Sequence, residues 1–532
     1  MIPRIFQRRA AEAPPAPEAA PVVAAPEPAA APLAPVRMRR ARYHPRNFEA
    51  ATHDRLNGDF LTGHVDINEI LRGQLGTLQG RARQLVRNAD YPAAWCRLVK
   101  DNVVGHLGIQ VQSRAANPRG DLDKLAAHEI EAHWRNWCEN HCDYMGRMQF
   151  LDFQELATTS WATNGEFLLR KVYGKEAGPY GLQLQALDTL RLDPDYSVEL
   201  TGDRRVLMGI ELDSVGRPIA YNVTSGPSGS TYLALNGREY VRLAAGQVIH
   251  GFLPQEIGQI RGITPMAPVI MRLHHLSKYE QAALINARVG ASTMGILENV
   301  DGDEDALVTD EADDDGPVFE VEPGTFRKIP KGWKSNKFDP AYPNGELPLF
   351  VKICLRDISG GVGVSYHGLT GDLESVNYSS GRIGELKERL TWMRLQTWET
   401  RALIRPVFDA WLREALIRQL ITVRVRPLPM TSEEKYRAVA FRYKRWPWVD
   451  PLKDANAAKI LRDMRARSLS DIIRDLGGDP EETWEEIARE EQVMARLGVA
   501  TTGTTTKEQV ANGNDGSGGV PGAGAPGADG NA

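Results

Sequence analysis

The apolar residues of this chain repeat with the period of a helix, then of a strand, then of a helix again, and this order constrains the fold. From Asp66 to about Cys138 the spacing is helical, as in Ile67, Ile70 and Leu71. From Asn164 to about Phe252 the period is two and turn residues multiply, which predicts a β-rich section with a hairpin turn at 214–218. Helical spacing then returns from Pro265 to about Arg288. The pattern predicts an α+β fold.

Helix start and stop signals divide the second half of the chain. Thr264 is a plausible N-cap for the helix at 265–288, with Pro265 at its first position. A loop-rich insert covers 290–344, and a shorter helix at 347–359 is expected to end at the glycines of 360–363. The polar segment 367–380 predicts a loop.

A long helix is predicted from about Arg382 to Trp411, with a kink at Pro406. The last helix has Asp479 as its N-cap, Pro480 at its first position, Glu482 completing a capping box and Gly498 as its end.

Length and composition limit the class of protein. A chain of 532 residues can form at least two sizeable cores. The Ala/Pro-rich stretch 10–35 and the Gly/Thr/Asn-rich stretch 500–532 predict disorder. With 64 Lys and Arg against 69 Asp and Glu, the formal charge of −5 disfavours tight, repressor-like binding of duplex DNA. Four cysteines fit a reducing compartment.

The chain contains no run of eighteen or more apolar residues, so no membrane span is expected. The first residues carry Arg4, Arg8 and Arg9, but acidic residues and prolines interrupt the stretch after them. A secretory signal is therefore not expected.

Several motifs for enzymatic chemistry are missing or fail on spacing. No Gly-x-x-x-x-Gly-Lys-Ser/Thr sequence occurs, so a phosphate-binding loop of an NTPase is not expected. Gly361 and Gly363 resemble a dinucleotide turn, but Tyr366 stands where the third glycine is needed. His128 and His133 are five residues apart, which turns them away from the shared face of a zinc-protease helix.

Cys138, His141 and Cys142 could share a helical face and bind zinc, although helix packing is the commoner role of such residues. No metal and no cofactor is predicted, and an enzymatic activity is not expected.

The insert contains nine carboxylates and no basic residue between positions 300 and 316. It differs from a calcium-binding EF-hand, because Ala306 stands where glycine is needed and Ala312 where a bidentate Glu is needed. The segment is either a solvated loop or an electrostatic docking surface for a basic partner. The nine residues are Asp301, Asp303, Glu304, Asp305, Asp310, Glu311, Asp313, Asp314 and Asp315.

A series of motifs between Val248 and Lys453 is similar to motifs of the lambda-type portal proteins of tailed bacteriophages. The order and spacing of these motifs carry the resemblance, which covers about 42–497. They are Val248-Ile-His-Gly-Phe252, Gly258-Gln-Ile-Arg-Gly-Ile-Thr-Pro-Met-Ala-Pro268, Tyr279-Glu-Gln-Ala-Ala-Leu-Ile-Asn-Ala-Arg-Val-Gly-Ala-Ser292, Gly361-Val-Gly-Val-Ser-Tyr366, Leu369-Thr-Gly-Asp-Leu-Glu-Ser-Val-Asn-Tyr-Ser-Ser380 and Arg445-Trp-Pro-Trp-Val-Asp-Pro-Leu-Lys453.

The resemblance implies a portal fold with a wing, two stem helices, an α/β clip, a tunnel loop and a C-terminal crown. It implies these parts: 1–36 a disordered Ala/Pro-rich arm, 37–263 the wing (helical, then β-rich), 264–289 a stem helix, 290–345 the clip with the acidic insert, 346–362 the second stem helix, 363–380 the tunnel loop, 381–415 the long wing helix, 416–498 the wing end and crown, and 499–532 a disordered tail.

The resemblance also implies a function. Such portals form rings, usually of twelve identical subunits, at one capsid vertex, where they conduct double-stranded DNA without reading its sequence. The expected stem-lining residues are Lys352 and Arg356, and the acidic insert is the expected partner-docking surface. The implied partners are other copies of the chain, the terminase large subunit, head-tail adaptors and a major capsid or scaffold protein. The implied location is the virion, with the host cytoplasm during assembly. The expected tunnel-loop residues are Gly371, Asp372, Glu374, Asn377 and Tyr378.

Helix dimensions agree with such a channel. Twelve helices spaced ~9.5 Å apart enclose a bore of ~25 Å, whereas six leave only ~8 Å. A duplex roughly 20 Å across passes only the larger ring. Two other readings stay open: a metal-dependent hydrolase that uses His128, His133, Cys138, His141 and Cys142, and a capsid or scaffold protein that is not a portal.

Overall fold

The computed structural model describes Gly63 and residues 65–225, 239–291, 295–299, 333–337, 346–374, 378–446, 451–478 and 480–498. Chain contacts separate residues 1–64 from residues 65–532, and all the helices and strands named in this section belong to the second unit. The predicted arm at 1–36 and tail at 499–532 lie outside the described residues. Among the described helices, none is both long and apolar enough to cross a membrane.

The first part of this unit is mainly helical, as the periodicity predicts. Asp66 and Asp123 each accept a backbone N–H, from Asn68 and Ala126, at the start of α1 and α3. A fourth helix, α4, was not predicted; it carries polar Gln154 and Thr158 on buried positions, which removes the helical alternation of apolar and polar residues. The helices are α1 (Ile67–Asn88), α2 (Asp90–Val103), α3 (Lys124–Asn140) and α4 (Phe150–Asn164).

Two antiparallel sheets follow, and they confirm the predicted β-rich section. The three-stranded sheet has the order β3-β2-β9, and the five-stranded sheet has the order β4-β5-β6-β7-β8. The predicted hairpin joins β6 to β7, where Asp213 accepts the N–H groups of Val215 and Arg217 and Gly216 has a φ of 83°. The strands are β2 (Glu166–Tyr173), β3 (Leu182–Leu187), β4 (Val198–Glu199), β5 (Arg205–Leu207), β6 (Ile210–Leu212), β7 (Pro218–Thr224), β8 (Tyr240–Ala244) and β9 (Val248–Phe252), with short 3-10 turns η2 (Thr189–Arg191) and η3 (Ala245–Gln247).

Helix α6 (Ile270–Ala291) begins later than the sequence predicts. Thr264 caps only a turn, in which its hydroxyl accepts the N–H of Met266 at 3.2 Å. Pro268 has no N–H to continue a helix from Thr264, and it disfavours helical backbone at Ala267. The prediction of Pro265 as the first helical residue is therefore wrong.

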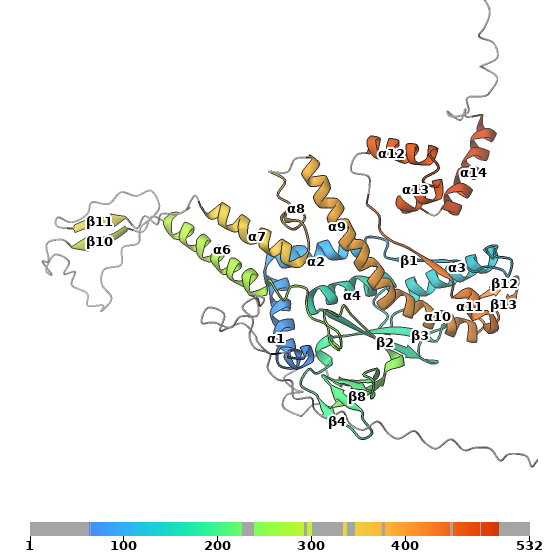
Figure 1. Ribbon diagram of the computed structural model, residues 1–532, viewed down its shortest axis with the longest axis horizontal. Coiled ribbons are helices and arrows are strands. Elements are labelled where there is room, and N and C mark those ends of the chain that lie inside the picture. The colour runs from blue at the N-terminus through green and yellow to red at the C-terminus, as the bar shows by residue number, and fades with distance from the viewer. Residues whose placement is uncertain are drawn as a thin grey trace, which may run out of the picture. The chain divides into compact units, whose positions relative to one another are not determined.

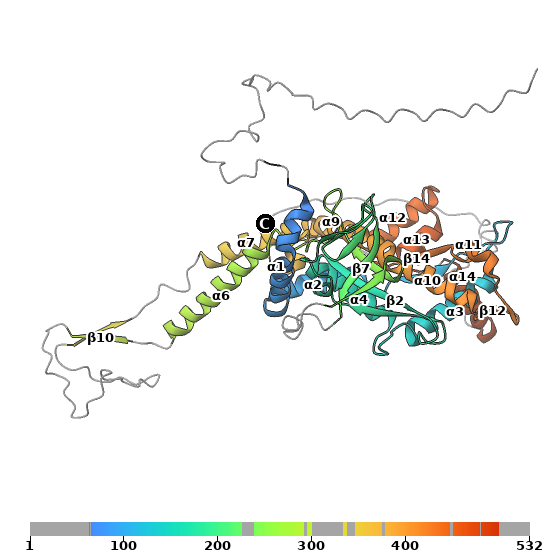
Figure 2. The same cartoon turned by 90° about the horizontal axis from the view of Figure 1, so that it is seen from below.

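Helix α7 (Leu347–Val362) continues beyond the predicted end at Ser359, because Gly360 and Gly361 remain helical. Gly363, with a φ of 76°, ends it. The predicted loop at 367–380 is also interrupted: Ser365 caps a short helix, α8 (Tyr366–Thr370). Both views in Figures 1 and 2 show α6 and α7 side by side. Between these helices in the sequence, β10 (Gly295–Asn299) pairs antiparallel with β11 (Trp333–Lys337).

The long helix begins at Tyr378, four residues before the predicted Arg382. It comprises α9 (Tyr378–Glu399), the π-helical turn η5 (Thr400–Ile404) and α10 (Arg405–Ile417), so it passes the predicted end at Trp411. Pro406 removes one backbone hydrogen bond and crowds the carbonyl of Ala402. The wider π turn just before the proline accommodates this defect.

The C-terminal part consists of small elements, and the last helix has the predicted start and end. Helix α14 (Pro480–Leu497) starts at Pro480 and ends before Gly498, whose φ is 69°. Asp479 and the side chain of Glu482 lie outside the described residues, so the predicted N-cap and capping box stay predictions. The other elements are β1 (Gln110–Ser113), β14 (Val439–Arg442), which pairs with β1, β12 (Thr422–Val423), β13 (Arg426–Pro427), η6 (Met430–Ser432), α11 (Glu433–Tyr436), α12 (Pro451–Asp463) and α13 (Leu469–Asp475).

An aromatic cluster from α3, α4 and α10 forms the centre of the larger core. The Trp134 ring stacks on Trp137 with centroids 5.1 Å apart, and it meets Phe150, Phe408 and Trp411 edge-on at 5.1–5.4 Å. Edge-to-face pairs of this kind add to the stabilisation from burial. This cluster fixes α10, and through η5 the rest of the long helix, on the helical front section.

Candidate functional site

The candidate site lies where α7, α8 and the start of α9 meet. Its support is the contact between α6 and α7, where Leu273, Leu276 and Leu355 are buried. Gly361 permits this contact, since a Cβ atom there would lie 2.3 Å from Cγ1 of Val269. Arg272 Nη1 and Asp357 Oδ2, 3.1 Å apart, add an exposed ion pair between the two helices.

The two predicted stem-lining residues both lie against Tyr366 of α8. Lys352 Nζ is 5.7 Å and the Arg356 guanidinium carbon 5.8 Å from the centroid of the Tyr366 ring. Lys352 Nζ also lies 3.5 Å from Asp372 Oδ2. The structure therefore brings two predicted stem residues together with one predicted loop residue.

Asp372 is the centre of the loop that follows α8. Its carboxylate accepts the N–H of Glu374 at 3.0 Å and the hydroxyl of Tyr366 at 2.9 Å. These two bonds, together with Lys352, hold the pKa of Asp372 below its usual value. Gly371, with a φ of 71°, forms the left-handed turn that ends α8 and aims Asp372 back at α7.

Other contacts anchor the same segment to α9. Ser365 Oγ donates to Glu388 Oε2 at 2.6 Å, and it accepts the N–H of Gly368 at 3.0 Å. His367 Nδ1 lies 2.7 Å from the carbonyl oxygen of Asp372. Sequence reasoning missed Ser365, Tyr366 and Glu388; the serine followed by a short run ending in Gly371 was the one signal of a capped helix.

The remaining predicted loop residues are described only in part. Glu374 is exposed, and its backbone N–H rather than its carboxylate contacts the site. Asn377 lies outside the described residues, and Tyr378 is the first residue of α9. The nine carboxylates at 301–315 also lie outside the described residues, between β10 and β11.

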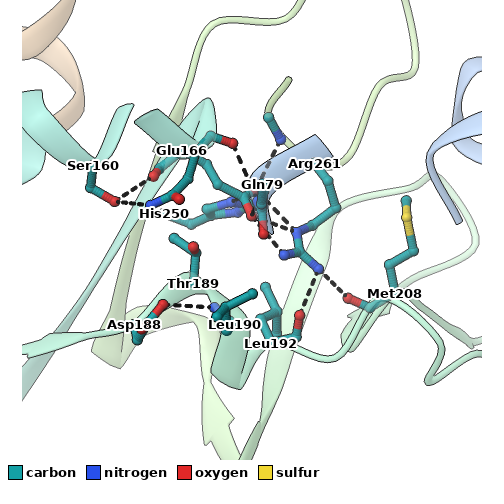
Figure 3. A network of polar contacts seen from close by, with 12 residues as sticks. Gln79, Ser160, Glu166, Asp188, Thr189, Leu190, Leu192, Met208, His250 and Arg261 are labelled. Atoms are coloured by element: carbon teal, nitrogen blue, oxygen red, sulfur yellow. Dashed lines mark hydrogen bonds and ion pairs between the residues drawn. The ribbon is translucent and has the colours of Figure 1, made fainter. Parts of the chain in front are cut away.

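A buried ionic network supports the chain where it leads into α6 (Figure 3). Arg261 Nη2 lies 2.6 Å from Glu166 Oε1, and both side chains are at most 1% exposed. Glu166 Oε2 also accepts the N–H of Gly262 at 2.9 Å and contacts His250 Nε2 at 3.0 Å. Gln79 of α1 donates to Glu166 Oε1 at 3.1 Å.

The network overcomes the cost of burying a charge. Burial would raise the pKa of Glu166, but Arg261 and His250 together hold it well below its usual value. Arg261 Nη1 donates hydrogen bonds to the carbonyl oxygens of Leu192 and Met208, at 3.0 and 2.9 Å. Gly262 completes the close packing, since a Cβ atom there would lie 2.2 Å from the carbonyl oxygen of Gly165. No local sequence pattern indicates a role for Arg261 or Glu166.

The residues of the alternative metal site have other partners. His133 Nδ1 lies 3.0 Å from the Tyr180 hydroxyl, and the Cys142 thiol donates to the carbonyl of Cys138 at 3.3 Å. Burial raises the pKa of Cys142 to about 12. In the parts of the chain that the structure describes, no group of three or more His, Cys, Asp or Glu side chains is arranged to hold a metal ion.

Comparison with known proteins identifies relatives along most of the chain. The sequence pattern of the family "Phage portal protein, lambda family" matches residues 53–396. The "Probable portal protein" of Halomonas phage phiHAP-1 is 31% identical over 464 residues, which cover 85% of this chain and 88% of that protein. "Portal protein B" of Escherichia phage lambda is 22% identical over 453 residues, which cover 77% and 82% of the two chains.

Solved structures give weaker matches. A chain from the neck of a native gene transfer agent (GTA) particle, computed with C12 symmetry, aligns with a TM-score of 0.38 and 12% identity, over 75% of this chain and 94% of that chain. A chain from the virion of the native particle aligns with a TM-score of 0.37 and 13% identity, over 75% and 93%.

Proposed function

The chain belongs to the lambda family of phage portal proteins, and on this premise we propose that it forms a ring at one capsid vertex through which double-stranded DNA passes. One observation carries the DNA-conducting part: Lys352 and Arg356 of α7 are joined to the loop at Asp372 through Tyr366. Each ion pair between a cationic side chain and a phosphate adds to DNA affinity. Cations that already have partners in their own chain attract phosphates but form weaker ion pairs with them. Such a cluster suits a surface along which DNA slides.

Exposed apolar side chains on α6 and α7 support assembly into a ring of identical subunits. Seven large apolar side chains on these two helices are at least 39% exposed. A single subunit would leave this apolar surface in water, which favours association. They are Met271, Tyr279, Leu284, Ile285, Leu349, Phe350 and Ile353.

Electron microscopy of the purified protein tests the ring. We expect class averages down the axis to show a closed ring, most simply of twelve subunits, with a bore of ~25 Å. Only a stable monomer of about 59 kDa across salt and concentration series, or a ring too narrow for a duplex, would contradict the proposal.

The loop between α8 and α9 is the proposed DNA-contacting part, including Asn377 and Tyr378. Changing both residues to Ala should leave ring formation intact and shorten the DNA that is packaged or retained. The control is Val215→Ala at the exposed tip of the β6–β7 hairpin, which should package normally. Full-length packaging at normal yield by the loop variant would show that these two side chains make no important contact with DNA.

The acidic segment at 301–315 is the proposed docking surface for a basic face of the packaging motor or of a head-tail adaptor. Changing Asp310, Glu311, Asp313, Asp314 and Asp315 to Asn or Gln should slow docking of the terminase large subunit and flatten its salt dependence. Association kinetics unchanged at low salt would leave the segment as a solvated loop.

The proposal places the protein in the virion, after assembly in the host cytoplasm with a major capsid or scaffold protein. Its role there is structural, and the proposal assigns it no catalytic step and no cofactor.

A further inference from the structure

An apolar groove lies between α6 and α7, on the helix pair proposed above as the stem. It encloses about 620 Å³ and is open to solvent. Met271 and Tyr279 line it from α6, and Phe350 and Cys354 line it from α7. The rings of Tyr279 and Phe350 meet edge-on with centroids 5.4 Å apart. Met271 and Phe350 are each 51% exposed, so the groove is unfilled in a single subunit.

An apolar ridge lies on another side of α7. Leu349 and Ile353 are one helical turn apart and are 56% and 48% exposed. At about 100° per residue, they are displaced roughly 100° around the axis from Phe350 and Cys354. They also lie roughly opposite the buried side of the helix, which contains Leu355. The ridge therefore cannot fill the groove of its own chain.

A groove and a ridge on different sides of one helix pair suit a contact between identical subunits. Different surfaces meet in a head-to-tail contact, which closes into a ring when the rotation is right. Charge does not oppose this contact. Arg272, which lines the groove, is paired with Asp357 at 3.1 Å, and Lys352, beside the ridge, is paired with Asp372 at 3.5 Å.

We infer that Leu349 and Ile353 of one subunit occupy the groove formed by Met271, Tyr279, Phe350 and Cys354 of the next subunit. The inference rests on the proposed ring and names a contact that closes it. Burial of these apolar side chains supplies the driving force.

A cysteine crosslink tests the contact, because Cys354 already lies in the groove. The variant Leu349→Cys places a second thiol on the ridge. Five residues along a helix separate the two positions by about 7.5 Å, which is too far for a disulfide within one chain. Mild oxidation of assembled rings should give a ladder of covalent multimers in denaturing, non-reducing gels.

Two controls make the crosslink specific. The double variant Leu349→Cys, Cys354→Ser should give no ladder, and neither should Leu390→Cys, a site on α9 that is 63% exposed. Cys354 should react with a small thiol reagent at least about tenfold more slowly in rings than in dissociated subunits, measured against the Cys354→Ser background. Rings that form without a ladder would overturn the inference and leave the proposed function standing. Absence of any ring would overturn both.

A disruptive pair of variants gives a second readout. Ile353→Asp puts a charge on the ridge and should reduce the ring fraction at a fixed protein concentration at least about tenfold, as measured by light scattering after size exclusion. Leu390→Asp, an equally drastic change at an exposed site, should assemble normally. Circular dichroism checks that both variants fold. Normal assembly of Ile353→Asp would contradict the inference.

Discussion

Glu399, at the end of α9, is a carboxyl group in an apolar setting. Its side chain is 0% exposed, and neither carboxylate oxygen has a hydrogen-bond partner in the described part of the chain. Burial raises its pKa to about 8, and the nearby Thr158 hydroxyl opposes this shift only in part. The group is therefore protonated at neutral pH, next to the π turn that absorbs the defect at Pro406.

This carboxyl predicts a pH dependence of stability that the variant Glu399→Gln removes. In the unfolded chain Glu399 ionises near its usual value of 4.5, whereas in the folded chain it keeps its proton up to about pH 8. Unfolding therefore releases a proton between these values, and the free energy of unfolding falls as pH rises, by up to ~1.4 kcal/mol per pH unit. Above pH 8 this contribution stops changing.

Denaturant unfolding of the wild type and the Gln variant between pH 5 and pH 9 measures the effect. The variant should gain stability relative to the wild type as pH rises to about 8. The exposed control Glu199→Gln should run parallel to the wild type. A difference between wild type and Glu399→Gln that is the same at pH 5 and pH 9 would show that the carboxyl does not titrate in this range.

The buried side chain of Arg261 also contributes to the free energy of unfolding, because it pairs with the buried carboxylate of Glu166. The variant Arg261→Met leaves Glu166 as a buried charge with His250 and Gln79 as its remaining side-chain partners. Breaking one side of such a pair costs ~3–5 kcal/mol. We expect a correspondingly lower denaturant midpoint. The double variant Glu166→Gln, Arg261→Met should lose less than the sum of the two single changes, and additive losses would mean that the two side chains do not act together.

At the scale of elements, Gly361 sets how closely α7 approaches the start of α6. A methyl group at this position would lie 2.3 Å from Val269 Cγ1, and Val269 is β-branched and buried, so it cannot easily turn away. Gly361→Ala should destabilise the protein by ~1–3 kcal/mol. The neighbouring Gly360→Ala meets no atom within 4 Å and should instead stabilise the helix by up to ~1 kcal/mol.

Thermal unfolding of the two alanine variants gives the comparison, and Val269→Ala should rescue Gly361→Ala. If the two variants shift the unfolding temperature equally, close packing at Gly361 does not control the helix pair.

The elements that the sequence predicts well are those with one buried face. Helices α1 and α2 show the expected period because solvent contacts their other face. Helix α4 has buried polar residues such as Gln154 and Thr158, which hide its period. The start of α6 differs from the prediction because Pro268 prevents a continuous helix from Thr264, and the end of α7 differs because Gly360 and Gly361 stay helical and Gly363 ends the helix.

The candidate site was predictable only in outline. The resemblance placed Lys352, Arg356 and Asp372 in adjacent parts of a channel, but it did not predict that Tyr366 would join them. The contact of Arg261 with Glu166 spans 95 residues of sequence, and no local pattern encodes such a pairing. Asn377 and the acidic segment stay predictions.

At the scale of the whole molecule, the proposed ring would repeat any change at the site once in every subunit. Lys352 Nζ lies 3.5 Å from Asp372 Oδ2, so under the proposal the cation already has a partner before it meets DNA. Asp372→Asn keeps the shape and removes the negative charge: its amide oxygen can accept the N–H of Glu374, and its amide NH2 can donate to the Tyr366 hydroxyl. A ring of twelve subunits would then present twelve additional free cations.

This variant predicts DNA that moves more slowly through a ring of normal structure. Each freed cation adds a phosphate contact, and DNA affinity then falls more steeply with salt. We expect Asp372→Asn particles to package or release DNA more slowly at low salt and at the wild-type rate at high salt. The double variant Asp372→Asn, Lys352→Gln should restore the wild-type salt dependence, because it removes the freed cation. Single-particle release kinetics across a salt series measure all three proteins, and equal slopes for them would show that Lys352 does not face the DNA path.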